Sequence, residues 1–441
     1  MLLKLNKKYL VIIFCYLLFF IFVPPFQVPD EPEHFENIYW VSRGTYPYNI
    51  TATNQKAKFF VDTMIADFQT WQVAKTKAKI NLNQVNKSRL WKINEFPEKE
   101  IKQFSQVSSQ AYHPPIYYLV GAVFFKISSW LGLNLVLRFY FTRLVSALFY
   151  FLTLFFAYKI LKKIFSDERT AKNLLVFFAI NPIMLQMGVG INHDISLVCL
   201  SIMTLWFLLE NKYLWAFVSA SLAMMVKMSG IVNYLVIFLW MIEKKAFKIS
   251  KKLFWYLLTS TLIISPWFIF NYIRYHKPIV EVVSLVCPKA APITNPLKVV
   301  VLTLFEYRHA IMHYSGFLGW NHLNPGRIFF YSYTIIFSLL LFYGIIGSFK
   351  EKKILRLFLF NLISFCLFFF IFNGWEKVSG LGCDIQGRYL LPAFLSMTIY
   401  IFYGLKKILK NNLLASKVLL YWSIFHVVYI FYFVLLRGYY F

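Results

Sequence analysis

The sequence predicts an all-α protein whose helices cross a membrane many times. Apolar residues make up 59% of the 441 residues, aromatic residues 20% and charged residues only 15%, whereas about a quarter of the residues in soluble domains are charged. The mean hydropathy is +0.58. Long apolar segments recur from end to end, and a helix satisfies its own backbone hydrogen bonds in lipid. We therefore expect one polytopic transmembrane domain over residues 1–441, with about eleven to thirteen spans.

The net charge of +27 does not indicate a nucleic-acid partner, because the basic residues form short clusters between the apolar segments. Such clusters anchor cytoplasmic loops and suit anionic lipid head groups. The clusters at 244–252, 350–353 and 406–410 therefore place those loops inside. Counting spans from them places two long polar insertions, 25–112 and 273–325, on the extracytoplasmic face.

The first apolar run covers residues 9–23 after a basic start, and no small-residue cleavage site follows it, so we expect an uncleaved first span. The basic loop at 159–173 would fall outside in this count. We therefore expect that one segment between 114 and 210 is split, re-entrant or non-spanning. The expected spans lie near 9–24, 114–132, 139–160, 172–190, 194–210, 212–227, 229–243, 253–272, 327–347, 354–372, 389–406 and 417–436.

The five cysteines form no Cys-x-x-Cys pair. Cys15, Cys199 and Cys366 fall within spans, where we expect small core residues. Cys287 and Cys383 fall in two outer loops, where oxidising conditions would allow a disulfide. The sequence leaves open whether these two cysteines pair.

The first insertion is expected to hold interfacial helices. Residues 31–43 place Phe35 and Tyr39 on one face, which is typical of an amphipathic helix lying at the membrane interface. Gly44 is a suitable residue for its end. A weaker amphipathic pattern over 297–309 falls in the second insertion.

Acidic residues are scarce, with 19 in the whole chain, yet three stand in Asp30-Glu31-Pro32-Glu33-His34 directly after the first span. One interpretation is a helix start, in which Asp30 is the N-cap and Glu33 completes a capping box favoured by the helix dipole. The other is chemistry, because a carboxylate fixed beside the bilayer can act as a general base on an acceptor hydroxyl. His34 would orient that carboxylate or contact a phosphate. The two interpretations are compatible, with Glu33 as structural support.

Three further polar groups stand at the ends of apolar segments. His113 precedes two prolines that suit a helix start, and it would lie on the extracytoplasmic face. Asp194 is either an N-cap or part of a site. Lys227 lies between two apolar runs, where an ionisable group is either functional or a terminus that snorkels to the interface.

Gln386-Gly387-Arg388-Tyr389 stands at the outer mouth of a late span. Arg388 carries a planar fork of donors that suits phosphate; the alternative is an interfacial anchor with Tyr389 in the aromatic belt. The sequence has no P-loop, GxGxxG, GxSxG or HExxH motif, so we do not expect an ATP-driven pump.

The order of these motifs resembles the GT-C glycosyltransferases, polytopic enzymes that take sugars from polyprenyl-phosphate carriers. More closely, the chain resembles an uncharacterised bacterial multi-pass membrane family allied to that class. The resemblance covers nearly the whole chain. Its motifs in order are Asp-Glu-Pro-x-His (30–34), Pro-Pro with aromatics (114–118), Asn-x-Asp (192–194), Lys-x-x-Gly (227–230), Phe-x-Gly-Trp (317–320) and Gln-Gly-Arg-Tyr-x-x-Pro (386–392).

The resemblance implies an inverting transfer from a polyprenyl-phosphate sugar to a glycan, lipid or protein at the extracytoplasmic face of the bacterial inner membrane. It implies Asp30 as the general base, with Glu31 as the alternate. Arg388, Lys227 and His113 would bind the donor phosphate and stabilise it as it leaves. The supporting residues would be His34, Asp194, Gln386 and Tyr389.

The resemblance implies no cofactor, because a phosphate-linked sugar is already activated. Some relatives bind a divalent metal, but Asp30 and Glu31 are adjacent and point apart on a helix, so we expect none to be required. A transporter or flippase for lipid-linked glycans is an alternative, but the sequence shows no internal halves with a matched pair of broken helices. A second alternative, a glycan polymerase or ligase, would carry its main external loop late in the chain.

Overall fold

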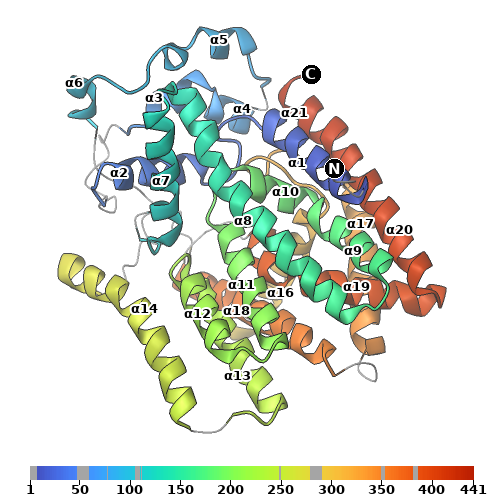
Figure 1. Ribbon diagram of the computed structural model, residues 1–441. Helices are drawn as coiled ribbons and strands as arrows, with labels where there is room; N and C mark the ends of the chain where they lie inside the picture. Colours follow the sequence, from blue (N-terminus) through green and yellow to red (C-terminus); the bar gives the residue numbers. More distant parts are fainter. Residues whose placement is uncertain are drawn as a thin grey trace, which may run out of the picture.

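Helices make up the regular structure of the described part of the chain (Figure 1), and the β structure found there is one isolated bridge between Leu318 and Leu323. The first and last helices lie side by side, since the Tyr440 hydroxyl donates to the carbonyl oxygen of Phe22 at 3.1 Å. Cys287 and Cys383 lie outside the described residues. The computed structural model describes residues 7–46, 59–76, 78–104, 110, 112–247, 250–278, 291–348, 353–380 and 386–441.

Six helical stretches among the described residues are long and apolar enough to cross a membrane. They are α8 (Leu135–Ile164), α14 (Lys251–Tyr275), α17 (Arg327–Ser348), α18 (Leu355–Ser379), η3 with α19 (Gly387–Ala393 and Phe394–Leu409), and α20, the π-helix η4 and α21 (Asn412–Tyr429, Ile430–Leu436 and Arg437–Tyr439). The other apolar helices are α1 (Lys7–Phe22), α7 (Ile116–Trp130), α11 (Asp194–Leu209), α12 (Tyr213–Met224) and η2 with α13 (Met228–Ile231 and Val232–Glu243). Every expected apolar segment is therefore helical. Several are shorter than the ~20 residues of a straight span, so the count of about eleven to thirteen spans stays a prediction.

The expected segment at 172–190 is broken in two. Helix α9 (Glu168–Ala179) and helix α10 (Pro182–Val189) meet at an angle of 65°. Pro182 cannot continue the hydrogen-bond ladder of α9, and the Asn181 side chain accepts a hydrogen bond from the backbone N–H of Ile183, which starts a new helix. The sequence predicts one split, re-entrant or non-spanning segment between residues 114 and 210, because the basic loop at 159–173 should lie inside. The bent pair α9 and α10 is a split segment of this kind.

Helix α2 (Glu31–Ser42) occupies the predicted range and is largely buried within the protein. It packs against α7 (Figure 1), and almost all of its side chains are buried, including those of Glu36 and Asn37. The backbone N–H of Val61 donates to Glu36 Oε2 at 2.9 Å. The rest of the insertion therefore covers the polar side of α2, and a position at the membrane interface stays a prediction.

Short helices of the first insertion build this cover. Phe60, between α2 and the next helix, stacks on Tyr39 with ring centroids 3.7 Å apart and an interplanar angle of 7°. The helices are α3 (Asp62–Asp67), α4 (Thr70–Thr76), α5 (Leu82–Lys87), η1 (Arg89–Trp91) and α6 (Glu98–Ile101). A buried apolar cluster that joins the insertion to α2 and α7 therefore fixes the chain that follows the first helix.

The 3₁₀ helix η3 packs against α11, α18 and α16 (Pro296–His313), the helix of the second insertion. A Cβ atom at Gly387 would lie 2.3 Å from the carbonyl oxygen of Ala310, so only glycine permits this approach. The backbone N–H of Gly387 also donates to His313 Nδ1 at 2.7 Å. These contacts fix the start of η3 and therefore the position of Arg388.

Candidate functional site

Arg388 lies between two carboxylates from distant parts of the chain. Its Nη2 pairs with Asp30 Oδ2, and its Nε lies 3.4 Å from Asp194 Oδ2. Its Nη1 donates to the carbonyl oxygen of Pro29 at 3.3 Å. The guanidinium therefore joins the turn before α2, the start of α11 and the start of η3.

Lys227 extends this arrangement. Its ammonium donates to Asp194 Oδ1 at 2.6 Å, and it lies 4.7 Å from the ring centroid of Tyr389. Acids and bases thus alternate as Asp30, Arg388, Asp194 and Lys227, which we name the charge chain. The Asp194 and Arg388 side chains are buried, whereas 31% of the Asp30 side chain is exposed. Asp30 is therefore the most accessible member.

Asp30 stands at the N-cap position of α2, as predicted, but its side chain does not cap the helix. Its φ is 62° and its ψ 9°, a left-handed conformation that is uncommon for a residue other than glycine. Strained residues of this kind are enriched at functional sites. The expected capping box is therefore wrong, because the Asp30 carboxylate points to Arg388 instead of the backbone of α2.

Glu31 is fully engaged with the protein. Its Oε1 accepts from Arg143 Nε and from the backbone N–H of Ile191, both at 2.8 Å. Its Oε2 accepts from the backbone N–H of Phe26 at 2.8 Å and from Arg143 Nη2 at 2.9 Å. Both side chains of this ion pair are 0% exposed. This saturated carboxylate fits a structural role better than that of the alternate base.

Arg143 was not among the residues singled out from the sequence. Its Nη1 and Nη2 donate to the carbonyl oxygens of Val23 and Pro24, each at 2.8 Å. Together with Glu31 it clamps the turn that leads to Asp30. The available signal was an arginine inside an apolar segment, which is costly unless it is paired.

Three histidines lie beside the charge chain. His34 and His193 rings are 4.5 Å apart between centroids, and His113 and His193 rings 4.3 Å apart. His34 Nδ1 is 3.0 Å from the Tyr118 hydroxyl, and His193 Nε2 is 3.7 Å from Asp194 Oδ1. The structure thus places His34 and His113 in one buried histidine group next to Asp194.

The remaining predicted residues shape η3. Gln386 stands at its N-cap position, and its carbonyl oxygen accepts from the backbone N–H of Tyr389 at 3.1 Å. The ring of Tyr389 lies over Lys227 and 5.6 Å from Arg388 Cζ. All nine residues proposed from the sequence therefore fall within this site or on the clamp beside it.

Burial and neighbouring charges shift the pKa values of three titratable residues at the start of α2. Burial alone would raise the pKa of Asp30, but the charge of Arg388, its hydrogen bond to the carboxylate and the nearby His34 and Lys227 together hold that pKa below its ordinary value. Burial, and then the charge of Asp30, raise the pKa of Glu33 to about 7. Burial lowers the pKa of His34 to about 3. Asp30 is therefore ionised at neutral pH, and His34 is neutral.

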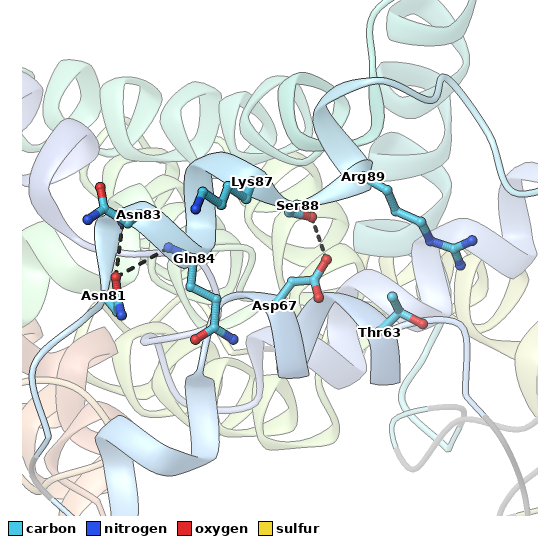
Figure 2. A pocket seen from close by; sticks show the side chains of 8 residues that line it. All are labelled: Thr63, Asp67, Asn81, Asn83, Gln84, Lys87, Ser88 and Arg89. Atoms are coloured by element: carbon cyan, nitrogen blue, oxygen red, sulfur yellow. Dashed lines mark hydrogen bonds between the residues drawn. The ribbon is translucent and has the colours of Figure 1, made fainter.

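Among the described residues, no group of three or more His, Cys, Asp or Glu side chains is arranged to hold a metal ion. A separate polar groove of about 510 Å³ lies on the first insertion (Figure 2), and its lining shares no residue with the charge chain. In it the Ser88 hydroxyl donates to Asp67 Oδ2. The lining residues are Thr63, Asp67, Asn81, Asn83, Gln84, Lys87, Ser88 and Arg89.

The helical bundle and the covered insertion after its first helix define a polytopic membrane protein with a GT-C-like fold, as the sequence predicts. ArnT from Cupriavidus metallidurans bound to undecaprenyl phosphate shares the fold, with a TM-score of 0.51 and 10% identity over 97% of this chain and 77% of that chain. The apo state of ArnT from the same organism gives a TM-score of 0.47 and 12% identity over 89% of this chain and 74% of that chain.

The chain belongs to the family described as predicted membrane protein (DUF2142), whose model matches residues 13–397. That match runs from the first helix into α19 and includes the whole charge chain. No curated protein matches the sequence.

Proposed function

We propose that this protein is an inverting glycosyltransferase that takes a sugar from a polyprenyl phosphate at the extracytoplasmic face of the bacterial inner membrane. The observation that carries the proposal is the charge chain, in which a partly exposed, ionised Asp30 stands beside the cations Arg388 and Lys227. A base and a phosphate-binding pair in one place are what such a transfer needs. The ArnT structure with undecaprenyl phosphate, which shares the fold, supports this donor class.

Arg388 and Lys227 are the proposed ligands of the donor phosphate. Arg388 offers a planar fork of N–H donors that suits phosphate oxygens. Lys227 is held by Asp194 at 2.6 Å, so its charge is fixed in place before the donor arrives. We place His113 beside these cations as a neighbour of the phosphate site, in the buried histidine group.

Donor binding would also change Asp30. In the described structure Arg388 pairs with Asp30 and lowers its pKa, which makes the carboxylate a weak base. A phosphate that recruits the guanidinium would weaken this pairing and raise the basicity of Asp30. The base would thus become effective when the donor is bound, which limits unproductive proton transfer.

The proposed transfer is a single displacement at the anomeric carbon. The acceptor hydroxyl gives its proton to the Asp30 carboxylate, and its oxygen forms a bond to the anomeric carbon. The bond from that carbon to the phosphate oxygen breaks on the opposite side, so the anomeric configuration inverts. The polyprenyl phosphate leaves with the bonding electron pair, and Arg388 and Lys227 stabilise its charge.

We propose Asp30 rather than Glu31 as the base because the two carboxylates differ in their surroundings. Glu31 accepts four hydrogen bonds and is buried, whereas Asp30 is partly exposed and its side chain pairs with Arg388. His34, Gln386 and Tyr389 would support the site, and Glu31 would hold the turn. Side-chain cations would supply the positive charge, so we propose that no metal is required.

The test is product stereochemistry. The full-length protein in lipid nanodiscs is given undecaprenyl-phosphate sugars of known anomeric configuration together with envelope glycans as acceptors. The proposal expects a new glycosidic bond of inverted configuration, seen by NMR, with release of one undecaprenyl phosphate per sugar. Movement of intact donor between the leaflets of proteoliposomes, without transfer in the nanodisc assay, would support the flippase alternative, and a retained configuration would contradict a single displacement.

A further inference from the structure

The turn that carries Tyr112 is anchored from several sides. The backbone N–H of His113 donates to the carbonyl oxygen of Gln110 at 3.1 Å. That same oxygen accepts from the Asn37 side chain of α2 at 3.3 Å, and the Tyr46 hydroxyl donates to the carbonyl oxygen of His113 at 2.8 Å. Backbone carbonyl groups on both sides of Tyr112 are therefore held by other parts of the protein, although Tyr112 lies in an insertion that the sequence alone leaves largely undefined.

The Tyr112 side chain borders the charge chain. It is half-buried, and its ring lies 4.0 Å from the ring of His113 at an angle of 35°. Burial raises the pKa of its phenol, and the neighbouring Tyr389 and Asp30 raise it further. One face of the ring is thus backed by His113, while the phenol lies within the electrostatic influence of the proposed base.

Tyr389 borders the same place from another element. It is also half-buried, and its ring is contacted by Lys227 at 4.7 Å. Its backbone is fixed because η3 is anchored to His313 through Gly387. Cations over an aromatic face orient that ring. Tyr389 therefore lies beside both cations, and Tyr112, packed on His113, lies within the electrostatic influence of Tyr389 and Asp30.

The proposed chemistry determines what must occupy that region. The donor phosphate would lie against Arg388 and Lys227, and the acceptor hydroxyl within hydrogen-bond reach of Asp30. Reacting atoms in such a complex are about 3–3.5 Å apart. Once the phosphate has drawn Arg388 away from Asp30, the anomeric carbon, and with it the sugar ring, would lie between the base and the cations, next to both tyrosines.

We propose that Tyr112 and Tyr389 are the walls that bind the sugar of the donor, an inference that rests on the proposed function. Ligand pockets combine aromatic surface with a few placed polar groups. A pyranose or furanose ring has apolar C–H faces that pack on a tyrosine ring, and hydroxyls at its rim that the phenols can hydrogen-bond. Tyr112 would thus bind the sugar, while Arg388 and Lys227 would bind the carrier.

The experiment separates sugar binding from carrier binding. Full-length protein in nanodiscs is titrated with undecaprenyl phosphate, bare or carrying glucose, mannose or arabinose. The variants are Tyr112→Ala and Tyr112→Phe, with Tyr421→Ala, an exposed tyrosine on α20, as a control. We expect wild type to bind at least one sugar-loaded carrier more tightly than the bare carrier. Tyr112→Ala should weaken that binding about tenfold without changing the affinity for the bare carrier.

The Tyr112→Phe variant separates the contribution of the aromatic ring from that of the phenol hydroxyl. Tyr112→Phe keeps the ring, so it should retain most of the preference for the sugar-loaded carrier. An unchanged affinity of Tyr112→Ala for that carrier overturns the inference, as does an equal loss for the loaded and the bare carrier, which would mean a structural role. A wild-type protein that binds neither form overturns the proposed function itself, which distinguishes the two failures.

Discussion

Replacement of Arg143 by methionine should destabilise the protein strongly. Arg143 donates two hydrogen bonds to Glu31 and one each to the carbonyl oxygens of Val23 and Pro24. Methionine fills much of the same volume but makes none of these bonds. The Glu31 carboxylate would remain buried with two backbone N–H donors and no counter-charge.

The cost follows from that unpaired charge. Removal of one partner of a buried ion pair costs about 3–5 kcal/mol, and neither side chain of this pair is exposed. In the double variant Arg143→Met with Glu31→Gln the charge is gone, although the orphaned backbone groups remain. The double variant should therefore recover about 2 kcal/mol of the loss, since coupled groups are not additive.

The assay is reversible unfolding by SDS, followed by tryptophan fluorescence, for wild type, both single variants and the double variant. The control is the same substitution in an exposed ion pair, Arg356→Met opposite Glu243. It should lower the free energy of unfolding by less than about 1 kcal/mol. A loss below about 1 kcal/mol for Arg143→Met, or a double variant no more stable than that single variant, would refute the reasoning.

Three other outcomes are expected. Arg388→Ala should weaken binding of undecaprenyl phosphate by about tenfold or more, and Arg388→Lys by less, because a point charge replaces the fork; equal affinities in a nanodisc titration would remove the phosphate role. Glu33 has a pKa raised from 4.5 to about 7, so the folded state holds a proton that the unfolded state releases. Stability should therefore fall as pH rises from 4.5 to 7, and Glu33→Gln should flatten that slope in unfolding measured across this window. Transfer should survive EDTA treatment, and a loss restored by added Mg²⁺ or Mn²⁺ would show a metal requirement.

Much of the helical framework could be predicted from the sequence. Apolar length and charged flanks located the segments because lipid requires internally bonded helices. The sequence indicated the break between α9 and α10 only indirectly. The basic loop at 159–173 fell on the outer face when the spans were counted, which required one irregular segment between residues 114 and 210. Its position depends on Asn181 and Pro182, whose effect is local and was not recognised in an apolar run.

The details of the site were less accessible. The sequence pattern placed Asp30 at a helix start but could not show that its carboxylate turns to Arg388, because that contact joins residues 358 positions apart. Burial of α2 was missed because its amphipathic pattern does not say what covers the polar side. Neither Arg143 nor Tyr112 belongs to a recognisable motif. Tertiary contacts alone bring Arg143 to the turn before Asp30 and Tyr112 close to the charge chain.

Of the two tyrosines proposed to bind the sugar, only Tyr389 lies in a sequence motif. Tyr389 was marked by its place after Arg388, whereas Tyr112 lies in a polar stretch with scattered aromatic residues. Its importance comes from the anchoring of its turn to Asn37 and Tyr46. Neither contact follows from local sequence, because each joins segments more than sixty residues apart.

The decisive comparison is donor binding against sugar transfer in Asp30→Asn, with Asp62→Asn, an exposed acid at the start of α3, as the matched control. Asparagine keeps the size of the side chain but cannot accept the proton of the acceptor hydroxyl. We expect Asp30→Asn to bind the undecaprenyl-phosphate sugar while its transfer rate falls by about 10²-fold or more, and Asp62→Asn to behave as wild type. Transfer at the wild-type rate by Asp30→Asn would contradict the assignment of the base.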